Sequence, residues 1–99
     1  MIPLEGVRFD AFAPLDGHVF LSVIGDVLIE LRLHDVRKLG HKRTDAARDP
    51  FSLTFRGWHG LRLPQGTCGF SCESLGEIEF FITQVGDGAR GSEFEAIFT

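Results

Sequence analysis

A chain of 99 residues that is 43% hydrophobic and 24% charged is long enough for one packed domain and is too apolar to be disordered. Its net charge of −4 argues against a nucleic-acid-binding surface, because contacts with phosphates require a basic face. Residues 1–15 have neither a basic leader nor an unbroken apolar run, so we expect no signal peptide. No stretch reaches the ~20 apolar residues that a membrane helix requires, so we expect a cytoplasmic protein that contacts neither membrane nor nucleic acid.

The first forty residues predict a helical turn followed by a β-hairpin. Phe9, Phe12 and Ala13 are spaced i, i+3 and i+4, so residues 8–17 are expected to form a short helical turn that plugs one end of a sheet. Residues 18–24 and 27–36 alternate with the period of two that is typical of strands. One face of the 18–24 segment is aliphatic, with Val19, Leu21 and Val23, and the other is mixed.

Four further strands are predicted in the second half of the chain. Alternation gives their inward residues as Phe51, Leu53 and Phe55 in 50–57; Cys68, Phe70 and Cys72 in 67–73; Ile78, Phe80 and Ile82 in 77–85; and Phe94, Ala96 and Phe98 in 93–99. Because Phe81 and Val85 lie on the opposite face of 77–85, this segment is expected to be a central strand covered on both sides.

These strands predict an all-β fold with a single domain over residues 1–99. The expected turns are Gly25-Asp26, Pro64-Gln65-Gly66 and Gly86-Asp87-Gly88. Ten phenylalanines, mostly at inward positions, are enough to fill a small closed barrel without a lumen. We therefore predict a small antiparallel β-barrel with one short N-terminal helical turn, and a β-sandwich as the alternative.

The only two cysteines, Cys68 and Cys72, lie four positions apart on a predicted strand. Positions i and i+4 of a strand share a face but are about 13 Å apart, whereas a disulfide needs Cα atoms within ~7 Å. We interpret both as reduced, buried packing thiols and not as a redox or metal-binding pair.

The segment 56–62, RGWHGLR, is a candidate binding loop. Trp58 and His59 lie between two glycines, and Arg56 and Arg62 flank them. This composition suits an exposed loop that offers an aromatic anchor and cations to a protein partner or a ligand. The alternative is that Trp58 folds back over the core as a lid.

Residues 35–49 are a second candidate binding loop, because this segment contains five basic and three acidic residues in an otherwise acidic chain. The segment lacks periodicity and is predicted to be the longest loop. Its cations, Lys42 and Arg43 among them, suit an acidic partner surface or a neighbouring copy of the chain; the alternative is a solvated loop.

The sequence contains no recognisable catalytic or metal-binding motif. The four histidines are dispersed, and the chain has no nucleophile elbow, no HExxH and no glycine-rich phosphate loop. Glu77/Glu79 and Glu93/Glu95 are expected to be solubilising edge charges and not acid–base pairs. We predict no catalytic residue, no metal ligand and no cofactor, and a protein that is not an enzyme.

Five segments, in this order and spacing, resemble an uncharacterised family of short bacterial domains of unknown function. They are Phe12-Ala13-Pro14-Leu15 with Gly17 and Phe20, PFSLTFRG at 50–57, LPQGT at 63–67, LGEIEFF at 75–81 and FEAIF at 94–98. The resemblance implies a β-rich domain with no established activity. Some members of the family are encoded near phage-tail-collar-like proteins, which implies a place in a tail-like assembly.

The sequence thus favours a non-catalytic structural or interaction module that associates with itself or joins a larger assembly. An edge strand, the Trp58 loop or the basic 35–49 loop is the expected contact. A small-ligand-binding barrel with a polar pocket near His59 and Arg56 is the second hypothesis. A hydrolase that uses His34 and His59 is the third.

Overall fold

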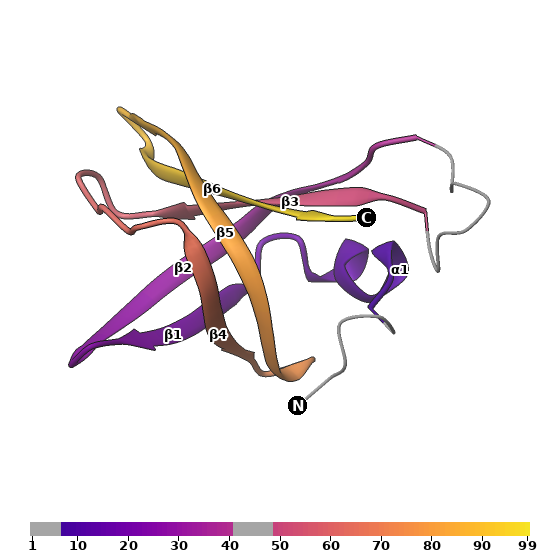
Figure 1. The fold of residues 1–99 in the computed structure, drawn as a ribbon, viewed down its shortest axis with the longest axis horizontal. Helices are drawn as coiled ribbons and strands as arrows, with labels where there is room; N and C mark the ends of the chain where they lie inside the picture. The colour runs from indigo at the N-terminus through magenta and orange to yellow at the C-terminus, as the bar shows by residue number, and fades with distance from the viewer. Residues whose placement is uncertain (1–6, 41–48) are drawn as a thin grey trace.

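A computed structural model describes residues 7–40 and 49–99 of the chain. A short helix, α1 (Phe9–Phe12), and a 3-10 turn, η2 (Ala13–Leu15), precede six strands (Figure 1). The strands are β1 (Val19–Ile24), β2 (Val27–Lys38), β3 (Phe51–Gly57), β4 (Gly66–Cys72), β5 (Gly76–Gly88) and β6 (Gly91–Phe98). The predicted all-β class with one N-terminal helical turn is confirmed.

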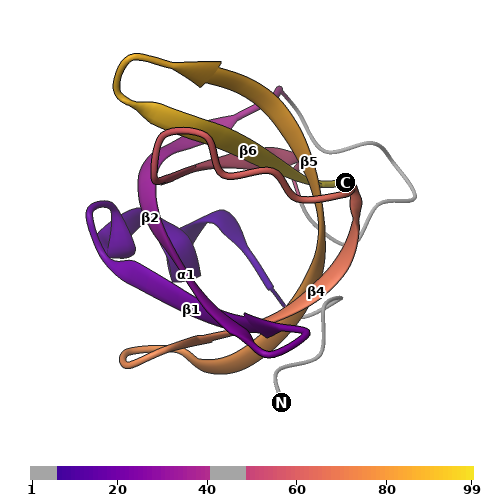
Figure 2. The same cartoon turned by 90° about the vertical axis from the view of Figure 1, so that its left-hand side faces the viewer.

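The six strands form a closed barrel in the order β1-β2-β3-β6-β5-β4, and every neighbouring pair is antiparallel (Figure 2). The barrel prediction is therefore confirmed over the sandwich. Ile24 pairs with Val27, so Gly25-Asp26 is the predicted two-residue turn. At the closure between β1 and β4, Leu21 pairs with Ser71, and the Ser22 hydroxyl donates to the Gly69 carbonyl at 2.6 Å.

Phenylalanine rings fill the interior of the barrel. Eight of the ten are buried: Phe12, Phe20, Phe51, Phe55, Phe70, Phe80, Phe94 and Phe98. Stacked pairs include Phe70 with Phe80, at 4.6 Å between ring centroids, and Phe51 with Phe98, at 4.7 Å. Burial of such large apolar side chains is the main driving force for this fold.

The helical turn closes the end of the barrel where β3 begins and β6 ends. Phe12 is fully buried and its ring contacts those of Phe20, Phe51 and Phe98. The Gly17 amide then donates to the Leu33 carbonyl of β2 at 2.6 Å, which ties the turn to the barrel. The predicted plug is confirmed.

Three details differ from the sequence predictions. Phe81 and Val85 are 52% and 54% exposed, because a barrel buries only its inner face and β5 is not covered on both sides. For β1 the prediction left open which face points inward; its aliphatic face lies on the outer wall, while Phe20 and Ser22 lie inside.

The other two differences come from β-bulges. A register shift between Leu33 and Asp35 lets β2 continue to Lys38, so the predicted loop does not begin at residue 35. A second shift, between Gln84 and Gly86, keeps Gly86-Asp87-Gly88 inside β5, where a turn was predicted. Among residues 7–40 and 49–99, no helix is long and apolar enough to cross a membrane.

Candidate functional site

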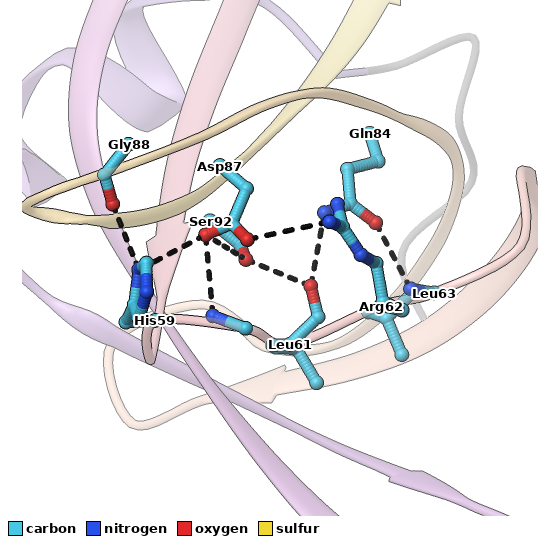
Figure 3. Close-up of polar contacts among 9 residues, drawn as sticks. His59, Leu61, Arg62, Leu63, Gln84, Asp87, Gly88 and Ser92 are labelled. Atoms are coloured by element: carbon cyan, nitrogen blue, oxygen red, sulfur yellow. Dashed lines mark hydrogen bonds and ion pairs between the residues drawn. The ribbon is translucent and has the colours of Figure 1, made fainter.

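A cluster of polar contacts joins the loop between β3 and β4 to the β5–β6 hairpin at one end of the barrel (Figures 1 and 3). Residues 58–63 supply the loop side of the cluster. Gln84 and Asp87 of β5 and Ser92 of β6 supply the hairpin side.

The loop begins with a tight turn that the sequence encodes locally. The Leu61 amide donates to the Trp58 carbonyl at 3.1 Å, and Gly60 has φ +86°. A positive φ at the third residue is the requirement of a type II turn, and glycine meets it without strain. His59, the second residue of the turn, therefore projects outward next to Trp58.

The bulge at Val85 decides where the Asp87 carboxylate points. Gln84 pairs with Phe94 and Asp87 pairs with Ser92, although their separation of three residues would put Gln84 and Asp87 on opposite faces of a regular strand. Because the extra residue restores the alternation, Asp87 faces Ser92 and the loop instead of solvent. The Asp87 side chain is accordingly only 14% exposed.

Asp87 contacts three groups of the loop and one residue of β6. Its Oδ1 atom accepts the Gly60 amide at 3.2 Å and the Ser92 hydroxyl at 3.1 Å. Its carboxylate also lies 3.3 Å from His59 Nδ1 and 3.5 Å from Arg62 Nη2. The hydrogen bond from Gly60 is the main cause that lowers the pKa of Asp87 below its usual value, with further lowering from Ser92, His59 and Arg62 and a partial offset from burial.

The carbonyl of Leu61 is the second anchor point. It accepts hydrogen bonds from the Ser92 hydroxyl at 2.7 Å and from the Gln84 side-chain amide at 2.9 Å. Gln84 also accepts the Leu63 amide at 3.1 Å, so one amide side chain satisfies both a donor and an acceptor of the loop backbone. The side chain of Leu61 is buried in the barrel end, which leaves the neighbouring side chains of the loop on the outside.

Ser92, His59 and Asp87 are the residue types of a hydrolase triad, but their arrangement differs from one. In a triad, histidine lies between the other two and takes the serine proton. Here the aspartate contacts both partners, while the Ser92 hydroxyl is fully buried and its single proton is shared between the Leu61 carbonyl, at 2.7 Å, and the Asp87 carboxylate, at 3.1 Å. His59 Nδ1 donates to the Gly88 carbonyl at 3.0 Å, because a carbonyl oxygen can only accept. The geometry anchors a loop and does not activate Ser92.

The family model for a domain of unknown function, DUF6916, matches residues 7–98, which include the whole cluster. This chain belongs to the DUF6916 family. The match agrees with the expected domain of unknown function over nearly the whole chain. The curated proteins and the solved structures give no match.

A second cluster in this DUF6916 domain lies on the outer wall of β2, β3 and β6. His34 Nε2 is 2.9 Å from the Glu93 carboxylate, and Arg56 Nη2 is 3.6 Å from the same Oε2 atom. His34 is the extra residue of the β2 bulge, between Leu33 and Asp35. Glu93 thus pairs with neighbouring side chains on the outer surface of a closed barrel, which has no sheet edge. The prediction that Glu93 is an edge charge is wrong.

A shallow hollow of about 190 Å³ lies beside this cluster, lined by Val19, Glu30, Arg32, Arg56, Gly57 and Trp58. Within the described part of the chain, the Arg56 Nε atom is buried and makes no hydrogen bond. An unsatisfied donor of this kind is costly to bury.

The DUF6916 barrel separates the predicted site residues into three groups. His59 and Arg62 meet at Asp87, with Trp58 beside them on the same loop, and Trp58 is 50% exposed. Arg56 belongs instead to the outer-wall cluster with Glu93. Lys42 and Arg43 lie outside the described residues.

Sequence reasoning missed the three residues that hold the loop, Gln84, Asp87 and Ser92. Asp87 was hidden because Gly86-Asp87-Gly88 has the composition of a turn. Gln84 and Ser92 carry no signal that a single sequence reveals, since their partners are backbone groups more than twenty residues away.

The prediction of buried thiols is confirmed for Cys72 and is wrong for Cys68. Cys68 and Cys72 are both free, Cys72 is buried and Cys68 is only partly buried. Burial raises the pKa of the Cys68 thiol. Over residues 7–40 and 49–99, no three His, Cys, Asp or Glu side chains are grouped so that they could hold a metal ion.

Proposed function

We propose that this DUF6916 domain is a non-catalytic interaction module that presents the 58–62 loop to a protein partner or to another copy of the chain. The observation that carries the proposal is the half-exposed Trp58 on a loop whose backbone is held from both sides by the β5–β6 hairpin. Tryptophan is a frequent hot-spot residue in interfaces, and a rigid loop loses little conformational entropy on binding.

The charges around Trp58 support a protein partner with exposed carboxylates. The side chains of His59 and Arg62 are 71% and 72% exposed, and each keeps a contact with the less exposed Asp87. An acidic partner can therefore approach the Arg62 cation and the His59 ring without breaking their contacts with Asp87. A larger assembly, of the tail-like kind that the sequence resemblance implies, is one setting that would supply such a partner, and the two free thiols suit a reducing compartment such as the cytoplasm.

Fluorescence provides a direct test, because Trp58 is the only tryptophan and the chain contains no tyrosine. We expect the emission to shift to shorter wavelength as the protein is concentrated or as its partner is added, in parallel with a rise in mass by light scattering. Trp58→Ala should abolish the association. Phe81→Ala, which removes another half-exposed aromatic ring, is the matched control and should leave it unchanged.

Two results would contradict the proposal. One is an association that Trp58→Ala leaves intact. The other is a protein that stays monomeric at every concentration and captures no partner, while Trp58 keeps the emission of a solvated indole.

A small-ligand-binding role is the second candidate, and the hollow lined by Arg32, Arg56 and Trp58 favours it. The barrel interior is filled with phenylalanine rings, so the ligand would bind on the outer wall, in the hollow between Trp58 and Arg32. Two arginines beside an indole suit a planar carboxylate. Titration with benzoate tests this candidate: Arg56→Gln should remove the binding, and Arg90→Gln, on the β5–β6 turn, should not.

A further inference from the structure

The outer wall at the β1–β4 closure carries a groove with a floor of small side chains. The outward residues of β4 are Thr67, Gly69 and Ser71, and all three are exposed. Bulkier residues flank them on the neighbouring strands β1 and β5, so the surface is hollowed here, with a volume of about 350 Å³.

One side of the groove is aliphatic. The outward residues of β1 include Leu21 and Val23, and Leu28 of β2 pairs with Val23. Val23 is 69% exposed and Leu28 is 57% exposed, and all three side chains line the hollow. An exposed aliphatic cluster next to a hollow is the surface pattern of a binding site.

The other side of the groove is acidic. Glu77 pairs with Ser71 and Glu79 pairs with Gly69, so both carboxylates stand beside the floor. The segment 66–82, which builds the β4–β5 side of the wall, contains three acidic residues and no basic one: Glu73, Glu77 and Glu79. The carboxylates beside the groove therefore have no cation within this segment to neutralise them.

We propose that this groove binds an extended peptide segment in which aliphatic residues alternate with lysine or arginine. Aliphatic side chains of the segment would cover Val23 and Leu28, and its cations would meet Glu77 and Glu79. Charge complementarity selects this occupant, because a second copy of this wall or an anionic lipid surface would bring like charges together. The groove surface is separate from the Trp58 loop, so the inference does not rest on the proposed function.

The size of the groove sets the length of the segment. Gly69 and Ser71 line the hollow, and Thr67 continues the outward row of β4 beyond it, so the row from Thr67 to Ser71 is about 13 Å long. An extended peptide of about five to seven residues spans this floor and places side chains alternately toward the two sides of the groove.

The probe for a binding experiment is an acetylated, amidated heptapeptide with the sequence KVKLKVK. Its titration into the full chain, followed by amide chemical-shift changes, should saturate and should move resonances of β1, β4 and β5. A peptide with glutamate in place of lysine, EVELEVE, should not bind, and a peptide with serine in place of the aliphatic residues, KSKSKSK, should bind at least tenfold more weakly. Added salt should weaken the binding of KVKLKVK.

Two variants distinguish binding in the groove from nonspecific attraction of a basic peptide to an acidic protein. Gly69→Leu fills the floor, and it should fold because its Cβ atom would lie 3.7 Å from Glu79 Cγ, an ordinary contact, on extended backbone. We expect it to abolish binding of KVKLKVK. The double substitution Glu77→Gln and Glu79→Gln should weaken binding about fivefold, as expected for two exposed ion pairs.

The matched control removes two carboxylates elsewhere, with Glu95→Gln and Asp49→Asn, and should leave binding unchanged. Equal binding of the peptide to Gly69→Leu and to the unaltered chain overturns the proposal, as does loss of binding in the matched control to the same extent as in the Glu77/Glu79 variant. A third result would also overturn the proposal: the unaltered chain does not bind the peptide but self-associates, and Gly69→Leu abolishes that self-association. The groove would then be an interface between copies of the chain.

Discussion

Ser92 and Asp87 face each other across the β5–β6 ladder, with the serine hydroxyl 3.1 Å from the carboxylate. This pairing exists because one extra residue in β5 shifts the register between Gln84 and Gly86. The consequence reaches the loop that carries Trp58, since the same carboxylate accepts the Gly60 amide. A bulge in the β5–β6 hairpin thus positions the exposed side chains of the loop between β3 and β4.

Asp87→Asn should lower the stability of the folded domain, by an amount that depends on pH. The pKa of Asp87 is lower in the folded chain than its ordinary value of about 3.9, so the stabilisation by its charge is fully present above about pH 4. It is lost as the pH falls through the folded-state pKa. Thermal unfolding should therefore show a melting temperature difference between the unaltered chain and Asp87→Asn that is largest near pH 6 and shrinks below pH 4.

The groups that face Asp87 supply a control for this pH dependence. Arg62→Gln removes one cation but keeps the hydrogen bond from Gly60, which is the main cause of the lowered pKa. It should reduce the melting temperature much less than Asp87→Asn at pH 6. A difference between Asp87→Asn and the unaltered chain that grows toward acid pH would contradict the assigned role of the carboxylate.

Gly91 should tolerate substitution far less well than Gly88, its partner in the β5–β6 register. Gly91 has φ +127°, and a Cβ atom there would lie 2.2 Å from the Gly57 carbonyl oxygen. A Cβ atom at Gly88 meets nothing within 4 Å. Chemical denaturation should show that Gly91→Ala costs about 2 kcal/mol or more and Gly88→Ala less than about 0.5 kcal/mol. Equal losses would contradict the close approach of the hairpin to β3.

Phe80 and Phe81 are adjacent on β5 and provide a matched test of the barrel. Phe80 is 2% exposed and stacks on Phe70, while Phe81 is 52% exposed on the outer wall. Phe80→Ala should lower the free energy of unfolding by about 3 to 5 kcal/mol, and Phe81→Ala by less than about 0.5 kcal/mol. A sheet covered on both faces would instead show similar losses for the two substitutions.

The sequence was informative about the fold because burial in a small barrel follows strand alternation closely. In 50–57 and 93–99 every residue predicted to be inward is buried. The hairpin at Gly25-Asp26 was readable for a similar reason, since a two-residue turn leaves a local signature. The plug at Phe12 followed from helical spacing in a segment too short for a full helix.

The site was less predictable because it depends on the two bulges and on contacts distant in sequence. A bulge changes the alternation by one residue, so Asp87 reads as part of a turn and Val36 reads as part of a loop. In β1, alternation identified an aliphatic face but not its direction. Phe20 lies inside and Val23 outside because the larger ring contacts Phe12 and Phe55 in the core.

The two cysteines should differ in reactivity and should not pair. Cys72 is buried, whereas Cys68 is partly exposed and burial raises the pKa of its thiol. Because the thiolate is the reactive form, Cys68 should react slowly with a disulfide reagent such as DTNB at pH 7, and faster as the pH rises past about 8.5. Cys72 should react only when the chain unfolds.

The variants Cys68→Ser and Cys72→Ser assign each reaction phase to one cysteine. Cys68→Ser should lose the slow reaction of the native chain, and Cys72→Ser should keep it. In denaturant without reductant, two thiols per chain should react with DTNB. The interpretation of the cysteines as separate packing residues would be contradicted if no thiol reacted in denaturant. It would also be contradicted if both cysteines reacted at the same rate in the native chain.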